Sequence, residues 1–421
     1  MKRGVFFIFT TVFLDMLALG LVAPSLPQLI AALTHGSSAR VAIILGNFGT
    51  VFALMQFLFS PVLGTLSDRF GRRPIILLSN FGLAVDYILM ALAPSISWLM
   101  CGRILAGITS ANMTAANAYI ADKSDSGERA KEFGYLGVAC ALGFIVGPGI
   151  GGTLSHMDAR LPFWFAALLS CSNGICTLLL LPESLPAVQR RNISFQQLSP
   201  LTNLQILRNN PQLLRLCSVT FLNSLAGVVL PSLYVLYVAD RFHWDSRSAG
   251  LSLMLAGFSA ILALATLVKP IIAQLGERGT VVLALLCGAT GMTIFGCAEN
   301  GMLFLAGIPL FALWGLAPAA AQSFMTRSIN ATEQGQLQGA LASISGVATL
   351  FGPALFTGIY SHSCLARACN DHPLWSMPGA AWLCSTILLL CAAGLMLSVS
   401  GTRVIEDSMS RATIETSTAA L

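Results

Sequence analysis

Long apolar stretches recur along this chain, and they restrict its fold more than any other feature of the sequence. A run of about 18 or more apolar residues with few charges is a candidate transmembrane helix. Only 10% of the 421 residues are charged, whereas a soluble domain carries about 25%. The sequence therefore predicts an all-α polytopic membrane protein. Its twelve predicted spans are 5–27, 41–62, 74–94, 97–120, 133–155, 161–181, 213–238, 248–270, 279–298, 301–325, 335–360 and 376–399.

The arginines and lysines predict how these spans are oriented. With the N-terminus inside, seventeen of them fall on the inner side of the membrane and five on the outer side. Such a bias is the positive-inside pattern of membrane proteins. We therefore expect a multi-pass protein of the bacterial inner membrane with both termini in the cytoplasm. The net charge of +5 then reflects topology, so we expect the lipid bilayer as a partner and no nucleic acid.

Similar stretches in the two halves of the chain predict an internal duplication. Gly147 has a counterpart in Gly352 and Gly71 in Gly276, both at an offset of 205 residues. Parallel repeats with a binding site at their interface are typical of alternating-access transporters. We therefore expect two pseudo-symmetric six-helix halves. The predicted units are an N-terminal half (1–181), a cytoplasmic linker (182–212), a C-terminal half (213–400) and a disordered tail (401–421).

Several motifs resemble those of the major facilitator superfamily. The stretch "GTLSDRFGRRPIILL" (64–78) is similar to the signature between the second and third helices of that family, and "GFIVGPGIGG" (143–152) to the fifth-helix signature of its drug/proton antiporters. The first half, with "LDMLALGLVAPSLPQLI" and "VDYILMAL", resembles tetracycline/proton antiporters more narrowly. The resemblance implies the major facilitator fold and proton-coupled export of a small amphiphilic compound such as tetracycline. We expect a monomer whose energy source is the proton gradient.

The charged loop around residue 68 has two interpretations. Its arginines can simply hold the loop inside the cell by the positive-inside rule. The resemblance implies instead that Asp68 pairs with a nearby arginine and with the start of the eleventh helix, and so latches the two halves in an outward-open state. Arg129 in the next inner loop is a candidate partner. The predicted latch consists of Gly64, Asp68, Arg69, Gly71, Arg72, Arg73 and Arg129.

Glycines are concentrated in the fifth predicted span. Glycine lets membrane helices approach closely, and a proline inside a helix removes a hydrogen bond and favours a kink. Generic helix packing explains this composition, and the resemblance implies more narrowly a tight, bendable seam between the halves. The residues of this signature are Gly143, Gly147, Pro148, Gly151 and Gly152.

Three charged side chains, Asp15, Asp86 and Arg103, lie clearly inside the spans rather than at their ends, and all belong to the first half. A charge at the bilayer centre costs about 2.5–3.5 kcal/mol on insertion scales, so such groups face a cavity or the bundle interior. One interpretation is a buried ion pair between Arg103 and an aspartate that locks helices together. The other is that Asp15 and Asp86 bind protons and substrate while Arg103 biases Asp15. The predicted coupling and substrate residues are Asp15, Gln56, Asp86, Arg103, Ser110, Thr114 and Asn117.

The second half departs from the tetracycline antiporters. The resemblance implies a histidine on the eighth helix and an acid on the ninth, but Ala260 and Gly288 occupy these positions in an ungapped alignment. The family exports tetracycline as a metal complex, so this difference leaves the substrate open. A siderophore or another metabolite is the alternative cargo, and a proton-coupled importer is the alternative direction.

Enzyme and metal motifs are missing from the sequence. It contains no H-E-x-x-H, G-x-S-x-G, Walker or C-x-x-C pattern, and its five histidines fall in predicted outer loops. We therefore expect no enzymatic activity, no cofactor and no metal site. Cys364 and Cys369 share one outer loop, where an oxidising compartment would permit a disulfide. Two free thiols are the alternative.

Overall fold

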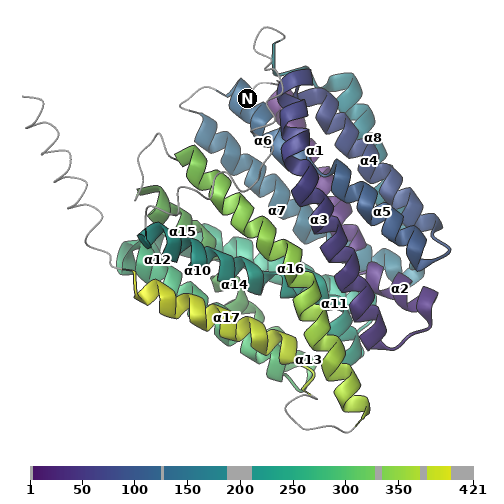
Figure 1. Cartoon of the computed structure of the whole chain (residues 1–421), viewed down its shortest axis with the longest axis vertical. Helices are drawn as coiled ribbons and strands as arrows, with labels where there is room; N and C mark the ends of the chain where they lie inside the picture. The colour runs from purple at the N-terminus through teal and green to yellow at the C-terminus, as the bar shows by residue number, and fades with distance from the viewer. Residues whose placement is uncertain (1–2, 125–127, 187–210, 328–333, 370–376, 400–421) are drawn as a thin grey trace, which may run out of the picture.

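The computed structural model describes residues 3–124, 128–186, 211–327, 334–369 and 377–399, and every regular element in these ranges is an α-helix. Figure 1 shows two helix bundles that meet at one end and diverge toward the other. The first bundle contains α1 (Arg3–Val22), α2 (Leu26–Thr34), α3 (Ser38–Phe70), α4 (Arg72–Leu92), α5 (Ile96–Thr109), α6 (Asn112–Lys123), α7 (Arg129–Met157) and α8 (Leu161–Leu180). The second contains α10 (Pro211–Gly227), α11 (Val229–Phe242), α12 (Ser246–Cys297), α13 (Gly301–Ala306), α14 (Ile308–Trp314), α15 (Leu316–Arg327), α16 (Gln334–Ala368) and α17 (Ala380–Leu397).

Ten helices in the described ranges are long and apolar enough to cross a membrane, rather than the twelve expected. α12 runs through two of the predicted spans, and its backbone breaks at Gly276, whose φ of 68° is left-handed. The predicted span 97–120 is instead interrupted between α5 and α6 at Ser110. The N–H of Ala111 at this break donates to Ser79 Oγ over 3.3 Å. The same N–H also donates to the Thr109 carbonyl over 2.9 Å, so this backbone group stays satisfied at the break, as a membrane interior requires.

The glycines of α7 bring this helix against two neighbours. A Cβ on Gly147 would lie 2.6 Å from Gly20 Cα of α1, and one on Gly143 or Gly151 would also meet the α1 backbone. On another face, a Cβ on Gly152 would run into the Ser246 carbonyl of α12. The predicted seam between the bundles is therefore one face of α7, while the other glycines of the signature pack α7 onto α1 within its own bundle.

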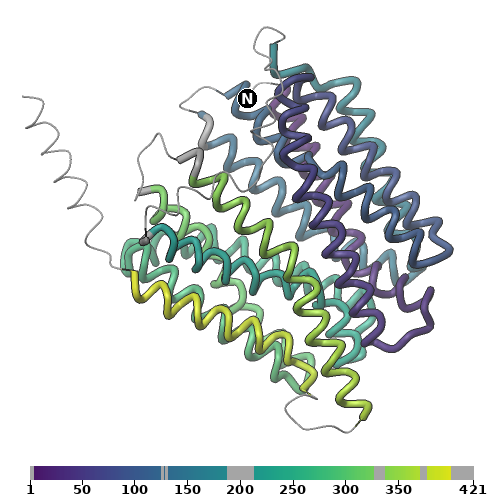
Figure 2. Tube along the Cα trace, viewed as in Figure 1, coloured from purple at the N-terminus to yellow at the C-terminus, as the bar shows by residue number. Residues whose placement is uncertain are grey.

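The two bundles touch at one end of the molecule, which we call the far end. There α3 lies beside α16 (Figure 2), and a Cβ on Gly49 would lie 2.9 Å from Pro353 Cβ. Ser38 Oγ donates to Asp240 Oδ1 of the second bundle over 2.9 Å. The two bundles are therefore in close contact at this end, where a pocket of only about 110 Å³ remains between α2 and the second bundle.

At the opposite end, which carries Arg69, Arg72 and Arg73 and which we call the arginine-rich end, the packing is loose. Gly64 of α3 and Gly137 of α7 have no atom within 4 Å of an added Cβ. The structure is therefore closed at the far end and open at the arginine-rich end. The predicted boundaries of the two halves stay predictions, because most of the linker 182–212 and all of the tail 401–421 lie outside the described residues.

The interiors of the two bundles differ in polarity. In the first bundle, buried amides bond one another and the backbone: Asn112 Nδ2 donates to Asn80 Oδ1 over 2.7 Å, and Asn173 Nδ2 donates to the Thr11 carbonyl over 3.0 Å. In the second bundle, aromatic rings fill the space, with Phe295 stacked on Phe304 at 4.4 Å between ring centroids. Among the described residues, the buried charged and amide side chains thus all belong to the first bundle.

We expect Gly147→Ala to lower the stability of the protein. The added methyl group would meet the α1 backbone, and overpacking of this kind costs about 1–3 kcal/mol. Thermal unfolding of the purified protein in detergent measures the loss. Gly137→Ala on the same helix is the matched control, and it should leave the midpoint unchanged or raise it. Equal midpoints for the two variants would contradict the packing described for α7.

Candidate functional site

A cavity of about 730 Å³ lies between the two bundles. Helices α1, α3, α4, α5 and α6 line one side of it, and α16 lines the other. It extends toward the arginine-rich end, where Gly64 of α3 and Gly339 of α16 belong to its wall. Five of the residues predicted for coupling and substrate binding line this cavity: Asp15, Gln56, Arg103, Ser110 and Thr114.

Asp15 is the acid that faces the cavity. Its side chain comes from the middle of α1, it is 7% exposed, and Oδ1 has no hydrogen-bond partner within the described part of the chain. A buried ionised carboxylate without a counter-charge is strongly unfavourable. Asp15 is therefore placed to take up a proton or a cationic group from the cavity.

Asp86 is the acid that does not face the cavity. It is fully buried between α4 and α5 and forms an ion pair with Arg103. Gly102 permits this approach, because a Cβ there would lie 2.6 Å from Asp86 Oδ1. The prediction had Arg103 act on Asp15, but the partner in the structure is Asp86. The fully buried Asp–Arg pair that the sequence left open as a structural interpretation is therefore formed.

Arg103 reaches the cavity wall while it pairs with Asp86. Its guanidinium lies over the Phe52 ring, 5.8 Å from the centroid, and it also donates to Met90 Sδ over 3.0 Å. Because the charges of the pair compensate one another, Asp15 is left as the uncompensated charge among these three groups. This division of roles was not visible in the sequence.

The predicted polar stripe on the fourth span is only partly continuous. Ser110 lies at the break between α5 and α6, where its Oγ accepts a hydrogen bond from Gln56 Nε2 over 3.0 Å. Thr114 lines the cavity one turn later. Asn117 is half-buried and is not part of the cavity wall. The stripe thus lines the cavity as far as Thr114 and not at Asn117.

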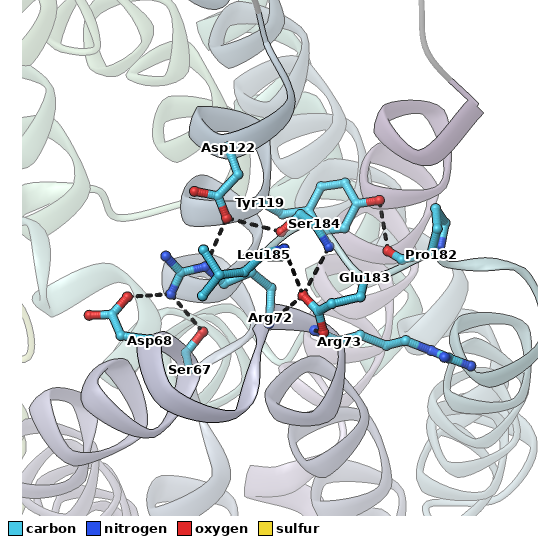
Figure 3. A network of polar contacts seen from close by, with 10 residues as sticks. All are labelled: Ser67, Asp68, Arg72, Arg73, Tyr119, Asp122, Pro182, Glu183, Ser184 and Leu185. Atoms are coloured by element: carbon cyan, nitrogen blue, oxygen red, sulfur yellow. Dashed lines mark hydrogen bonds and ion pairs between the residues drawn. The ribbon is translucent and has the colours of Figure 1, made fainter. Parts of the chain in front are cut away.

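A charged network surrounds Arg72 at the arginine-rich end (Figure 3). Arg72 pairs with Asp68 over 2.5 Å and with Asp122 at the end of α6 over 3.0 Å. Asp122 Oδ2 also accepts a hydrogen bond from Ser184 Oγ over 3.0 Å. The latch motif is thus tied to α6 and to the segment after α8.

Glu183 caps the start of α4 in the same network (Figure 3). Its carboxylate accepts the N–H groups of Arg72 and Arg73 over 2.9 and 3.2 Å. Gly71, with a φ of 106°, has no room for a Cβ beside this carboxylate. Free N–H groups at a helix start favour an anion, so Glu183 is well placed for this role.

Comparison with known proteins identifies the family. Residues 8–353 match the sequence profile of the Major Facilitator Superfamily. The chain belongs to this family of transporters. The tetracycline resistance protein, class C, of Escherichia coli is 35% identical over 386 residues, which cover 91% of this chain and 94% of that protein. Multidrug resistance protein 2 of Bacillus subtilis (strain 168) is 25% identical over 351 residues, 82% of this chain and 86% of that protein.

A solved structure supports the fold of this transporter. The human organic anion transporter MFSD10 (TETRAN) matches with a TM-score of 0.68 and 24% identity over 94% of this chain and 99% of that one. The predicted major facilitator fold and the resemblance to tetracycline antiporters are therefore confirmed. With ten apolar helices that can each cross a bilayer, the transporter is a multi-pass membrane protein.

Within the part of the chain that the structure describes, no contact between the halves engages the predicted latch of the transporter. Asp68 pairs with Arg72 of its own bundle, and Gly64 beside it has open space. Arg69 lies over the Phe70 ring, 5.3 Å from the centroid, and Arg73 donates to the Leu178 carbonyl. The side chain of Arg129 lies outside the described residues. An arginine-rich end that is open is the state in which such a latch would be released, so the latch stays a prediction.

The sequence analysis missed Asp122 and Glu183. Asp122 precedes Lys123 at the end of α6, and Glu183 follows Pro182 after α8. The available signal was an acid directly after a span, on the side predicted to be inside. The partners of Glu183, however, lie more than 100 residues away along the chain. Pairing over that separation is set by the arrangement of the helices and not by local sequence.

The predicted disulfide is not formed in the structure. Cys364 and Cys369 are both free thiols at the end of α16. Residues five apart on a helix point to different sides, because each residue turns by about 100°. Cys364 Sγ instead accepts a hydrogen bond from Arg367 over 3.1 Å. Among the described residues, no cluster of three or more histidines, cysteines or acids could hold a metal ion.

We expect Glu183→Gln to loosen the start of α4. Charge-assisted hydrogen bonds are about twice as strong as neutral ones, and a carboxylate at a helix N-terminus contributes about 0.3–1 kcal/mol. Amide hydrogen exchange should therefore accelerate in the peptide that contains Arg72 and Arg73. Glu128→Gln, at an exposed acid before α7, is the control and should leave that exchange unchanged. Unaltered protection in Glu183→Gln would show that the cap is dispensable.

Proposed function

We propose that this transporter exports a small amphiphilic compound, such as tetracycline, in exchange for protons across the bacterial inner membrane. In this proposal the arginine-rich end and both termini face the cytoplasm. The observation that carries the proposal is the position of Asp15, a buried acid in the cavity between the bundles with an unpartnered oxygen. The names of the relatives, which include tetracycline resistance and multidrug resistance proteins, support a drug as the cargo.

A single carboxylate in this cavity is sufficient to couple two fluxes. The ionised form of Asp15 attracts a cationic substrate, and a proton that binds the same oxygen removes this attraction. Substrate and proton therefore exclude one another at Asp15, which is the condition for exchange. The driving force is about 1.4 kcal/mol per pH unit and about 2.3 kcal/mol per charge for each 100 mV.

The closed far end and open arginine-rich end correspond to one of the two states that such exchange requires. In this state the cavity is reached from the side that we assign to the cytoplasm. The other state would separate α3 from α16 and α7 from α12 at the far end and bring the arginine-rich ends together. Rigid-body rocking of two repeats around a central site is the usual form of alternating access.

We expect Asp15→Asn and Asp86→Asn to fail in different ways. Asp15→Asn should fold normally but lose substrate-dependent proton release, because the amide cannot titrate. Asp86→Asn should lower the free energy of unfolding by about 3–5 kcal/mol, because it leaves Arg103 buried without a counter-charge. Thermal unfolding in detergent separates the two variants.

The transport assay uses inside-out vesicles with an imposed inward-acid pH gradient. Tetracycline, cationic drugs and ferric chelators are added one at a time, and substrate-dependent proton release is recorded. Release with drugs supports the proposed cargo, while release with chelators alone would assign a metabolite exporter. Full proton-coupled transport by Asp15→Asn would overturn the proposed coupling role of this acid.

A further inference from the structure

A second cavity, of about 300 Å³, lies inside the second bundle between α10, α12, α15 and α16. Ala342 and Ser345 belong to its wall and also to the wall of the cavity that contains Asp15. The two cavities therefore adjoin along α16. Volumes of about 300–1,000 Å³ are typical of small-molecule sites, so the second cavity can accept part of a ligand that occupies the first.

The wall of the second cavity is polar but uncharged. Apolar residues such as Leu285 and Met325 supply part of it, and no residue that lines it is ionisable. Its amide and hydroxyl side chains belong to Thr220, Asn223, Ser224, Gln322, Gln338 and Ser345. Amides and hydroxyls both donate and accept hydrogen bonds, so this wall suits carbonyl and hydroxyl groups. A charged group would find no counter-charge here, which makes its burial unfavourable.

Gly288 and Trp314 lie beside this cavity, next to its wall residue Asn223. A Cβ on Gly288 would lie 2.6 Å from Trp314 Cγ, so the glycine makes room for the indole. Trp314 is 9% exposed, and its Nε1 donates to Asn223 Oδ1 over 2.7 Å. Because the oxygen of Asn223 already accepts the hydrogen bond from the indole, the NH₂ group of this side chain is left to donate to a ligand. The resemblance implied an acid at the position of Gly288. Here the glycine instead makes room for Trp314, which orients the neutral NH₂ donor of Asn223.

We propose that the second cavity is a subsite for an uncharged part of the substrate that is rich in carbonyl and hydroxyl groups. Asp15 binds the cationic group of the same molecule in the first cavity. This inference rests on the proposed function, since it takes Asp15 as a substrate contact. The substrate class is therefore a compound with one cationic end and one neutral, hydrogen-bonding end. Compounds that carry a charge at both ends are excluded by the uncharged wall.

The test compares two probes that each carry a cationic group but differ in hydrogen-bonding groups. Tetracycline has a face rich in carbonyl and hydroxyl groups, whereas tetraphenylphosphonium has a cation and no hydrogen-bonding group. The variant is Thr220→Val combined with Gln338→Leu, since both residues line the second cavity and not the first. Thr290→Val is the matched control, because Thr290 and Thr220 both donate to the carbonyl four residues earlier, and Thr290 is exposed on α12.

Equilibrium binding to the purified full-length chain gives the expected result. The double variant should raise the Kd of tetracycline about tenfold and change that of tetraphenylphosphonium less than twofold, and Thr290→Val should change neither. An equal rise for both probes would overturn the subsite and indicate a general loss of structure. Unchanged binding of tetracycline would show that the second cavity does not contact the substrate.

The same experiment separates the subsite from the proposed export function. One outcome is that the double variant weakens the binding of tetracycline and not that of tetraphenylphosphonium while the wild-type chain releases no proton in vesicles. In that case the subsite stands and proton-coupled export is wrong. If Asp15→Asn binds tetraphenylphosphonium as tightly as the wild type does, Asp15 is not the cationic contact. A wild-type chain that binds neither probe overturns the proposed substrate class.

Discussion

The ion pair between Asp86 and Arg103 is the interaction on which the polar interior of this transporter depends. Neither residue could be buried alone inside a membrane helix without a cost of several kcal/mol. Paired, they place an arginine at the cavity wall without adding net charge to it. In the proposal, Asp15 on α1 is then the group that is ionised when a cation occupies the cavity and protonated when it does not. In the proposed mechanism the pair thus leaves binding to a single acid rather than to three interacting charges.

The bundles are in close contact at the far end and loosely packed at the arginine-rich end. Gly152 brings α7 against the backbone of α12, and Gly49 brings α3 against the Pro353 ring of α16. Close small-residue packing of this kind has few long side chains to reorder, so two packed helices can separate as rigid bodies. The position of the glycines along α3 and α7 therefore decides which end of the cavity is closed in this state.

The sequence predicted features that depend on local composition and repetition. Gly71 and Gly276, found as partners in the duplication, are the two glycines with positive φ in the described residues. Asp15, Gln56 and Ser110 were assigned to a cavity and line one. What failed depends on the relative rotation of helices, which periodicity does not determine. Arg103 can face either aspartate by spacing alone, and the choice of Asp86 follows from the close approach of α5 and α4 at Gly102.

The network at the arginine-rich end has a structure that suits a switch. For Asp68 to reach α16 it would have to release Arg72, and its side chain is 44% exposed. Arg72 itself is buried, so the release depends on its second acid, Asp122, which keeps the arginine paired. Arg72 would keep its bond to Asp122, and Glu183 would still cap the start of α4. The fixed part of the network therefore holds the arginine in place while its exposed partner is free to exchange.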